Sequence, residues 1–355
     1  MTNYLLAGGG TAGHVNPLLA LADAIKANSA NHKIYALGTK EGLERELVPA
    51  RGYELLTVAR LPFPRKLNSY AFKFPFLFSK AVRDCQRIIQ EKSIDVVVGF
   101  GGYASAPAYL AAKRCSIPVV VHEANALPGW ANKLGAKFAA AVGVAFVNTP
   151  LKGAVHVGMP LRREIEALGA GTNQAAARKF FGLQEENVTL LVTGGSLGAK
   201  RINDSVEGAR KVLSAAGIQV LHIVGGKSDL PQVSEKDYVR INYCDRMDLA
   251  IAASNFAVSR AGASSVSEFA ASGLPAMYVP YPIGNGEQKL NVAQLVSAGG
   301  GVMVSDSEFT PAYIAEHLVP MISNSKSLSE MTKAAKSVGI ADGTRRLFAL
   351  VQGVL

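Results

Sequence analysis

Short apolar runs recur along the chain, and most of them end in a turn rich in glycine. The clearest runs cover residues 4–7, 94–98, 118–121, 188–193, 220–224, 239–242 and 255–258. Runs of this length that glycine and proline bound are typical of strands buried on both faces of a parallel sheet. Helical patterns follow several of them, at 108–113, at 174–181 and from Thr310 onward. The pattern therefore predicts an α/β protein in which strands and helices alternate.

Four of these runs lead into a glycine corner, by which we mean a turn of small residues before a predicted helix. The corners are residues 8–14, 99–107, 194–199 and 261–263. We expect the helix after the first corner to begin near residues 16–17, where a proline suits a first turn. At the last corner, Ser265 and Glu268 have the spacing of a capping box. Such corners present free N–H groups and the positive end of a helix dipole, so they suit phosphate groups.

The second half of the chain opens as the first does, with a strand, a glycine corner and a helix. A chain of 355 residues is also longer than a single core usually supports. Residues 148–163 are irregular and contain Pro150, Gly153 and Pro160, which suits a crossover between domains. We therefore expect two Rossmann-like, doubly wound parallel-sheet domains, at residues 1–162 and 163–340.

The first corner also satisfies the G-x-G-x-x-G pattern of dinucleotide-binding folds through Gly8, Gly10 and Gly13. An NAD enzyme needs, in addition, an acidic residue at the end of its second strand to hold the ribose. Here the second strand, at 33–37, runs into the sequence Gly-Thr-Lys. The pattern therefore argues against an NAD enzyme.

Charge and cysteine content narrow the possible functions. The formal net charge of +10 favours partners that bear phosphate, which include nucleic acid, an anionic membrane and a phosphorylated substrate. The three cysteines are scattered singly, so we expect no zinc knuckle, no disulfide framework and a reducing cytoplasm as the setting. The amino terminus has no basic lead, and no apolar run is long enough to cross a bilayer. We expect a protein that is neither exported nor membrane-spanning.

Residues 60–83 interleave five phenylalanines with six cationic residues, and three prolines interrupt them. A segment of this kind fits a surface that lies among lipid headgroups, with rings inward and Lys or Arg toward anionic lipid. Alternatively, the rings cover the core of the first domain while the charges face water. The sequence favours neither reading.

Residues 259–291 resemble the donor-nucleotide region of glycosyltransferases of the GT-B class. They read Arg-x-Gly-Ala-x-Ser-Val-Ser-Glu at 260–268, then Gly-Leu-Pro-Ala at 273–276, then Gln-x-x-Asn at 288–291. Four further motifs match glycosyltransferase family 28 in order: Gly-Gly-Tyr at 101–103, His-Glu-x-Asn at 122–125, Gly-x-Pro-x-Arg at 158–162 and Gly-Gly-Ser-x-Gly-Ala at 194–199. The chain is thus similar, over nearly its whole length, to the family 28 hexosyltransferases that add N-acetylglucosamine to a lipid-linked muramoyl-pentapeptide.

This resemblance implies a GT-B fold, with two Rossmann-like domains that face each other across a cleft and a final segment, at about 341–355, that returns to the first domain. It implies inverting transfer from UDP-N-acetylglucosamine to the C4 hydroxyl of MurNAc in undecaprenyl-diphospho-MurNAc-pentapeptide, for peptidoglycan synthesis. We expect no cofactor, and no metal either, since His122 and Glu123 do not form an H-E-x-x-H motif.

The resemblance also implies where such a protein works. The expected location is the cytoplasmic face of the cell membrane, with peripheral attachment to its anionic inner surface. Cell-wall synthesis proteins are possible partners, and nucleic acid is not expected.

The same resemblance implies the site residues. His14 is the first candidate for the catalytic base, because a helix start disfavours its charged form, and Glu123 is the second. For UDP-N-acetylglucosamine the implied residues are Thr11, Ala12, Gly13, Asn125, Arg162, Ser196, Cys244, Ala263, Ser264, Ser265, Val266, Ser267, Glu268 and Gln288, and for the acceptor diphosphate they are Gly101, Gly102 and Tyr103. Ala12 departs from the family, which commonly has glycine there.

Structural roles compete with these functional ones. His14 can be a capping or packing histidine, Ser196 an ordinary N-cap, and Glu268 part of the capping box alone. Two other functions also stay open. One is another GT-B UDP-sugar transferase acting on a lipid or natural-product acceptor, and the other is a non-catalytic protein that binds nucleotide sugars.

Overall fold

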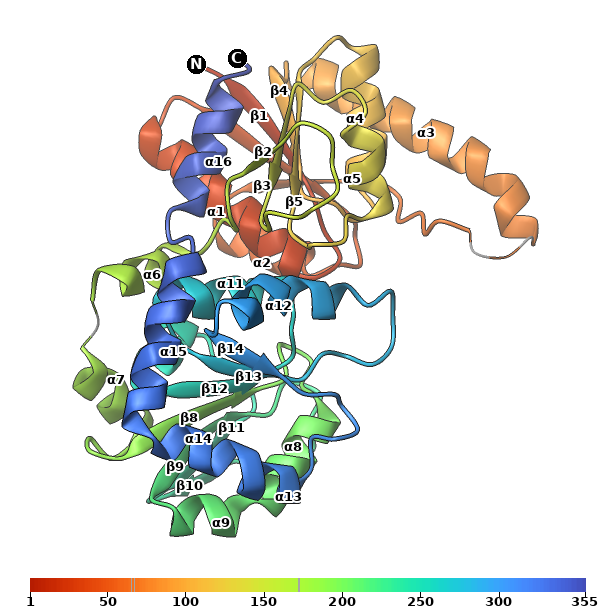
Figure 1. The fold of residues 1–355 in the computed structure, drawn as a ribbon. Helices are drawn as coiled ribbons and strands as arrows, with labels where there is room; N and C mark the ends of the chain where they lie inside the picture. Colours follow the sequence, from red (N-terminus) through yellow and green to blue (C-terminus); the bar gives the residue numbers. More distant parts are fainter. Residues whose placement is uncertain (65, 67, 172) are drawn as a thin grey trace. The chain divides into compact units, whose positions relative to one another are not determined.

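The computed structural model describes residues 1–64, 66, 68–171 and 173–355. The described chain divides into two compact units, each with its own sheet (Figure 1). Unit 1 comprises Met1–Arg162 together with Asp342–Leu355, and unit 2 comprises Arg163–Ala341. Among the described residues, no helix is both long enough and apolar enough to cross a membrane.

The sheet of unit 1 has seven parallel strands in the order β3-β2-β1-β4-β5-β6-β7. Its strands are β1 Asn3–Ala7, β2 Lys33–Gly38, β3 Glu54–Thr57, β4 Val96–Gly99, β5 Val119–Glu123, β6 Ala141–Val144 and β7 Ala154–His156. The apolar runs at 4–7, 94–98 and 118–121 form the middle of this sheet, where both faces are covered. Strand β7 lies inside the stretch 148–163, which we expected to be irregular throughout.

Helices cover both faces of the unit 1 sheet. They are α1 Ala12–Asn28, α2 Glu44–Ala50, α3 Ser69–Glu91, α4 Ser105–Arg114, α5 Trp130–Gly135 and α16 Gly343–Gln352. On one face, Tyr4 and Leu6 of β1 share a core with residues of α1 and with Leu347 of α16. On the other face, Leu5 and Ala7 share a core with residues of α3 and α4. The alternation along β1 follows from the twofold period of a strand.

The last helix belongs to unit 1. Leu347 and Val351 of α16 are fully buried in the core that α1 lines, and Thr344 Oγ1 donates a hydrogen bond to the Leu161 carbonyl over 3.1 Å. Figure 1 shows α16 beside α1, although the two helices lie at opposite ends of the sequence. The chain therefore starts and ends in the same unit.

Helix α1 begins at Ala12, which is earlier than the expected start near residues 16–17. The Thr11 carbonyl accepts hydrogen bonds from the N–H groups of His14 and Val15, both over 3.1 Å, and these bonds close the first turn. Pro17 therefore lies inside the helix, where it removes only the bond that its own N–H would make. The early start makes the glycine corner itself the amino terminus of α1.

The sheet of unit 2 has the order β10-β11-β9-β8-β12-β13-β14, and only the β10–β11 pair is antiparallel. Its strands are β8 Val188–Thr193, β9 Ile218–Ile223, β10 Val233–Glu235, β11 Tyr238–Ile241, β12 Phe256–Ser259, β13 Ala276–Tyr278 and β14 Gly301–Met303. A large core on one face of this sheet has residues of β8, β12 and β13 at its centre.

The helical segments of unit 2 pack around that sheet. They are α6 Arg163–Glu166, the 3-10 helix η1 Ala167–Ala170, α7 Gln174–Phe181, α8 Lys200–Gly208, α9 Arg210–Ala215, α10 Met247–Ala253, α11 Ala263–Ser272, α12 Glu287–Ser297, α13 Pro311–Tyr313, the π-helix η2 Ile314–Leu318, α14 Val319–Ser323 and α15 Ser325–Val338. The helical pattern that begins near Thr310 thus breaks into several helices.

Strand order reverses in the middle of each sheet. In unit 1, β1 lies between β2 and β4, and in unit 2, β8 lies between β9 and β12. Ligands of doubly wound sheets bind at the carboxyl ends of the strands where this reversal occurs. All four predicted glycine corners follow strands at these two places. The predicted α/β class with two doubly wound sheets is confirmed, and the topology selects one edge of each sheet as the candidate site.

Candidate functional site

The glycine loops after β1 and β4 pack against each other by backbone alone. A Cβ atom on Gly102 would lie 2.6 Å from the Gly9 carbonyl oxygen, and Gly102 also has a φ of 78°. Gly101 and Gly10 have positive φ as well, at 89° and 92°. Glycine is needed here both for conformation and for the close approach of the two loops.

His14 lies in the first turn of α1 and faces these loops. Its Nδ1 is 3.1 Å from the Gly9 carbonyl oxygen and 3.4 Å from Thr11 Oγ1. A carbonyl can only accept a hydrogen bond, so this contact requires a proton on Nδ1, and a neutral imidazole then keeps its lone pair on Nε2. Nε2 lies 3.2 Å from the place that a Cβ on Gly101 would occupy. Nε2 therefore lies next to the second glycine loop.

Glu44, on α2, binds the backbone of the first glycine loop. It is fully buried, its Oε2 accepts from the Gly10 N–H over 2.8 Å, and its Oε1 accepts from the N–H and hydroxyl of Thr39 over 2.8 and 2.9 Å. Burial by itself raises the pKa of this carboxyl group, but the hydrogen bonds from Gly10 and Thr39 outweigh it and the pKa is lowered. Glu44 is therefore an ionised carboxylate that lies buried beneath the loop.

Glu123, at the end of β5, organises the loop that follows it. Its oxygens accept from the N–H groups of Asn125 and Gly129, both over 2.9 Å, and from Asn132 Nδ2 over 3.0 Å. Asn132 Oδ1 in turn accepts from the Tyr109 hydroxyl over 2.7 Å. Burial raises the pKa of Tyr109, so its hydroxyl stays a donor. The Glu123 carboxylate thus ties one loop and two helices together.

His122, the neighbour of Glu123, is part of the core. It is fully buried, its Nε2 lies 3.0 Å from the Gly158 carbonyl oxygen, and burial lowers its pKa to about 4. The imidazole is therefore neutral near pH 7 and donates from Nε2. This position gives His122 a structural role in the core of unit 1.

In unit 2, the loop after β8 packs against the loop after β9. A Cβ on Gly198 would lie 2.1 Å from the Val224 carbonyl oxygen, and the Gly226 N–H donates to the Ser196 carbonyl over 3.1 Å. Helix α8 begins at Lys200 with Ala199 as its N-cap. The alternative that Ser196 is an ordinary N-cap is therefore wrong, because the loop after β8 continues to Ala199 before the helix begins. The Ser196 side chain is exposed in the loop.

Helix α11 begins at Ala263, with Gly262 as its N-cap. The first bond of the helix runs from the Val266 N–H to the Gly262 carbonyl over 3.0 Å, so the N–H groups of residues 263–265 have no acceptor within the helix. The predicted capping box is wrong, because Ser265 lies inside the first turn and not at the cap. Gly273, with a φ of 73°, ends the helix. The amino terminus of α11 is thus open to an anion.

Polar side chains link the loops along this edge of the unit 2 sheet. Arg260 donates to the Val279 carbonyl over 3.0 Å and to Asp306 over 2.5 Å, and its guanidinium lies 5.5 Å from the centre of the Tyr281 ring. Gln288 Oε1 accepts from the Tyr281 N–H over 2.8 Å, and Asn291 Nδ2 donates to the Ala261 carbonyl over 3.2 Å. These bonds connect the loops after β12, β13 and β14.

The remaining predicted residues lie at the same edges. Asn125 is half-buried after β5, Tyr103 lies under the Arg60 guanidinium at 5.0 Å, and Cys244 is buried in the loop between β11 and α10. Arg162 is half-buried at the end of unit 1. Within the described part of the chain, no group of three or more His, Cys, Asp and Glu side chains could hold a metal ion.

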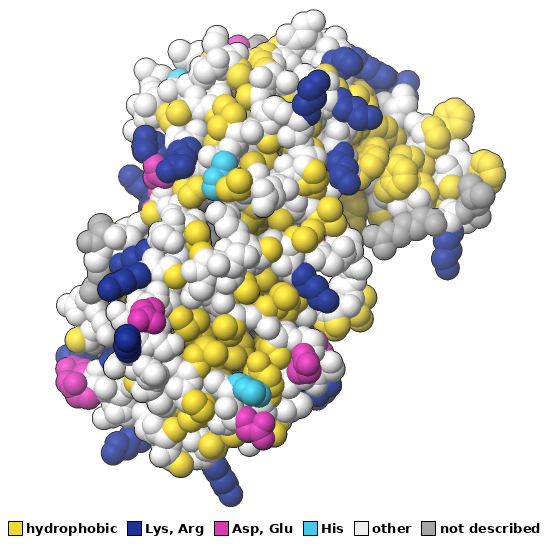
Figure 2. All heavy atoms as spheres, viewed as in Figure 1, with side chains coloured by type: hydrophobic (Ala, Val, Ile, Leu, Met, Phe, Trp, Pro, Cys, Tyr) yellow, Lys and Arg dark blue, Asp and Glu magenta, His cyan; other side chains and the backbone are white. Residues whose placement is uncertain are grey.

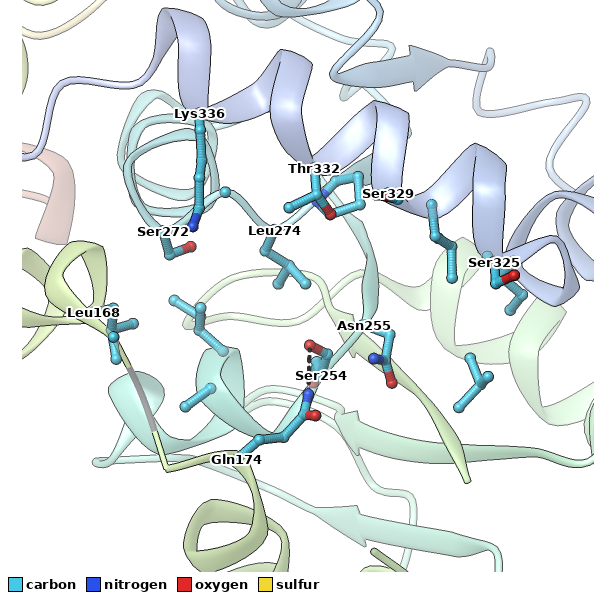
Figure 3. Close-up of a pocket in the computed structure, with 18 of the residues that line it drawn as sticks. Leu168, Gln174, Ser254, Asn255, Ser272, Leu274, Ser325, Ser329, Thr332 and Lys336 are labelled. Atoms are coloured by element: carbon cyan, nitrogen blue, oxygen red, sulfur yellow. Dashed lines mark hydrogen bonds between the residues drawn. The ribbon is translucent and has the colours of Figure 1, made fainter. Parts of the chain in front are cut away.

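A cavity of about 650 Å³ lies at the opposite edge of the unit 2 sheet (Figure 3). It is lined by residues at the amino ends of strands, such as Val188, Asn255 and Pro275, and by Ser329 and Lys336 of α15. None of the predicted site residues lines this cavity. This cavity and the glycine corners are thus separate features of unit 2.

Two family models match the chain. The model of the glycosyltransferase family 28 N-terminal domain matches residues 4–144, and that of the glycosyltransferase family 28 C-terminal domain matches residues 189–347. The chain belongs to glycosyltransferase family 28.

Relatives within family 28 match over nearly the full length. The UDP-N-acetylglucosamine–N-acetylmuramyl-(pentapeptide) pyrophosphoryl-undecaprenol N-acetylglucosamine transferase of Clavibacter sepedonicus is 55% identical over 353 residues, which cover 99% of this chain and 96% of that protein. The transferase of the same name from Streptomyces coelicolor is 46% identical, with 98% and 97% covered. The crystal structure of Acinetobacter baumannii MurG superposes with a TM-score of 0.80 at 26% identity, with 99% and 100% covered. The predicted GT-B fold class is confirmed.

Three supporting residues of this family 28 chain were missed by sequence reasoning. Glu44, Tyr109 and Asn132 belong to no recognisable motif, and only their contacts connect them to the glycine loops and to Glu123. The one feature that these three residues share is a polar side chain that becomes buried when the chain folds. By contrast, the departure at Ala12 has a simple explanation, because Ala12 is the first residue of α1 and its φ is not positive.

The contact between the two loops of unit 1 can be tested by adding one methyl group. We expect Gly102→Ala to destabilise unit 1 by about 1–3 kcal/mol more than Gly153→Ala. Gly153 also has a positive φ, of 70°, but a Cβ there would have nothing within 4 Å, so it controls for backbone strain. Urea unfolding followed by the fluorescence of Trp130, the chain's single tryptophan, reports on unit 1. Equal losses would contradict the loop contact.

Proposed function

We propose that this family 28 enzyme transfers N-acetylglucosamine from UDP-N-acetylglucosamine to the C4 hydroxyl of MurNAc in undecaprenyl-diphospho-MurNAc-pentapeptide. The product is lipid II, so the reaction serves peptidoglycan synthesis and through it cell shape and division. The observation that carries this proposal is the 55% identity, over 99% of the chain, to a transferase named for that reaction. The solved structure of CalG4, the calicheamicin glycosyltransferase, covers 99% of the chain at only 14% identity.

The chemistry makes two demands on the protein. An α-linked donor becomes a β-linked product, so the acceptor oxygen displaces the nucleotide in one step with inversion. A base must take the proton of the acceptor hydroxyl, and the leaving diphosphate must be stabilised as negative charge develops on it. We assign the base to unit 1 and the stabilisation of the leaving diphosphate to unit 2.

His14 is the residue that we assign as the base. Its Nδ1 is held protonated by the Gly9 carbonyl at 3.1 Å, which leaves Nε2 as the acceptor of a proton. Glu123 is the weaker candidate, because three donors of the protein already engage its two oxygens. A proton taken up there would break at least one of these bonds, and with it the order of the loop at 124–129.

The leaving diphosphate is assigned to unit 2. The N–H groups at the start of α11, on Ala263, Ser264 and Ser265, point outward with the positive end of the helix dipole behind them. The exposed hydroxyl of Ser196 adds a donor from the loop after β8. The family resemblance adds Arg162, the last residue of the first segment of unit 1, as a positive charge for the diphosphate, and we expect no metal.

The rest of the donor is assigned by position along the same edge. Glu268 is one turn into α11 and suits the ribose hydroxyls, and the backbone at Cys244 suits the uracil. Gln288 suits the sugar, because its oxygen is held by the Tyr281 N–H and its amide NH2 is left as the donor. The family resemblance adds Asn125 and residues 11–13, which belong to unit 1, as further candidates for contact with the donor. Val266 and Ser267 are kept from the resemblance alone, because the Val266 side chain is buried and its N–H already donates to the Gly262 carbonyl.

The acceptor diphosphate is assigned to the second glycine loop, at Gly101, Gly102 and Tyr103. This loop lies beside His14 Nε2, so a lipid-linked substrate held there would present its sugar to the base. The guanidinium of Arg60 lies over the Tyr103 ring at 5.0 Å and places a positive charge next to the loop.

An aromatic patch on unit 1 suits attachment to the membrane in which that acceptor resides. Phe63, Tyr70, Phe74, Phe78 and Trp130 form it through ring contacts with centroids 5.0 to 6.2 Å apart. Phe72 and Phe76, on the same helix α3, are 73% and 79% exposed. The core-packing reading of the sequence fits Phe78, which packs on the core of unit 1, whereas the exposed Phe72 and Phe76 stay candidates for contact with lipid.

Cations surround the exposed rings. Lys66, Lys73, Lys80 and Arg83 are exposed, while Arg65 lies outside the described residues. Figure 2 shows hydrophobic side chains gathered on the segment that extends from unit 1 in Figure 1, with Lys and Arg near it. Apolar rings flanked by cations suit an anionic lipid surface. We therefore assign peripheral attachment to the cytoplasmic face of the membrane, while partners among cell-wall synthesis proteins stay a prediction.

The reaction is tested by incubating the full chain with UDP-N-acetylglucosamine and a lipid I analogue. We expect UDP release that depends on the acceptor, together with a disaccharide product seen by mass spectrometry. UDP-glucose in place of the donor controls for donor specificity. UDP release at the same rate with and without the acceptor would exclude the proposed transfer.

The base is tested with His14→Ala. Turnover should fall roughly 10²- to 10⁴-fold, because general base catalysis is lost, while the affinity for UDP, measured by calorimetry, should stay within a few fold. His317→Ala is the control, since this exposed imidazole of η2 lies in no predicted site. Near-normal turnover of His14→Ala would remove His14 from this role.

Membrane attachment is tested with the double variant Phe72→Ser/Phe76→Ser. Binding to vesicles that contain phosphatidylglycerol should weaken roughly tenfold to a hundredfold in flotation, because two exposed rings no longer enter the lipid. Phe180→Ser, an exposed ring of α7 in unit 2, is the matched control. Flotation equal to that of the unchanged protein would refute the assignment of these rings.

A further inference from the structure

We propose that Glu44 is a positioning residue that acts on His14 through a single peptide group. This inference deepens the proposed function and rests on it, since it concerns the base of that reaction. The pair is separated by 30 residues in sequence, and no motif joins them.

The connection is the peptide between Gly9 and Gly10. Its N–H, on Gly10, donates to Glu44 Oε2 over 2.8 Å, and its carbonyl, on Gly9, accepts from His14 Nδ1 over 3.1 Å. The N–H and C=O of one trans peptide point in opposite directions within one plane. Carboxylate, peptide and imidazole are therefore in series, with a hydrogen bond at each end of the peptide.

The carboxylate is fixed in place. Its other oxygen accepts two hydrogen bonds from Thr39, which is itself buried, and three glycines surround it. Cβ atoms on Gly9, Gly38 and Gly42 would lie 2.4, 2.4 and 2.0 Å from atoms of the Glu44 side chain. The glycines thus make room for a charged group under the loop, where water cannot screen it.

The charge has a definite effect on the imidazole. A negative charge at the N–H end of a peptide increases the negative charge on its carbonyl oxygen, because hydrogen bonds in a chain polarise one another. That oxygen then favours the proton on Nδ1 and stabilises the positive ring that forms when Nε2 takes a second proton. A carboxylate does the same directly in a Ser-His-Asp triad, and here a peptide is inserted between the two groups.

The arrangement also limits what the first glycine corner can bind. Because the Gly10 N–H is engaged by Glu44, it is not a donor to a phosphate. The corner resembles a phosphate-binding loop in sequence, but its central peptide serves the histidine. From the sequence pattern alone, the N–H groups of this corner would be expected to donate to a phosphate.

The direct readout is the tautomer of His14, measured by NMR in protein with ¹⁵N-labelled histidine. The chain has six histidines, and the spectrum of His14→Ala assigns the signal. The unchanged protein should show Nδ1 protonated and Nε2 unprotonated at neutral pH. A protonated Nε2 would overturn the proposal, and this measurement needs no variant of Glu44 and no substrate.

The second readout compares Glu44→Gln with Glu46→Gln. Both changes lie on α2, but Glu46 is exposed. Glu44→Gln should move the His14 population toward protonated Nε2 and lower kcat roughly tenfold to a hundredfold, with KM for the donor within about twofold. Glu46→Gln should change neither. Glu44→Asp, which keeps the charge, should retain more of the Nδ1 tautomer than Glu44→Gln.

A merely structural role for Glu44 predicts a different outcome. If Glu44 acts through His14, adding Glu44→Gln to His14→Ala should lower kcat no further, whereas independent effects would multiply. Multiplying effects, or an unchanged tautomer in a folded Glu44→Gln protein, would overturn the proposal. Failure of the transfer assay on the unchanged protein would refute the proposed function instead, while the tautomer measurement would still decide whether the connection exists.

Discussion

Backbone contact between glycine loops is the constraint on which both candidate half-sites depend. In unit 1 the loops after β1 and β4 touch where Gly102 meets the Gly9 carbonyl, and in unit 2 the loops after β8 and β9 touch where Gly198 meets Val224. Both contacts lie at the carboxyl edge of a parallel sheet, next to the reversal of strand order. Only glycine permits this approach, so the loops are held by main chain, and their N–H and C=O groups keep fixed directions.

Buried polar groups then determine what each loop can do. Under the first loop, Glu44 takes up the Gly10 N–H and leaves the Gly9 carbonyl to His14. After β5, the Glu123 carboxylate holds a longer loop by accepting from the N–H groups of Asn125 and Gly129, and Asn132 donates to the same carboxylate. In unit 2 the N–H groups at the start of α11 have no such carboxylate within the helix turn, so they remain suited to an anion. Similar glycine corners thus acquire different chemistry from the side chains beneath them.

Helix α3 combines a structural and a surface role along its length. Its later part enters the core through Val82 and Cys85, while its first turns carry the aromatic patch and the exposed Phe72 and Phe76. The spacing of rings by four residues, at 70, 74 and 78, produces one aromatic stripe, and the exposed rings lie off that stripe. A single segment of sequence therefore supported two interpretations, because it contains residues of both kinds.

The sequence by itself determined the α/β class, the doubly wound sheets, the glycine corners and the membership of family 28, because apolar runs, glycines and motif order are local properties of the chain. It misplaced the starts of α1 and α8 and proposed a capping box that α11 lacks, since a helix start depends on which loop its first turn contacts. Only the tertiary structure decided that Glu44, Tyr109 and Asn132 support the site. Their partners are distant in sequence, and a buried hydrogen bond exists only after folding brings donor and acceptor together.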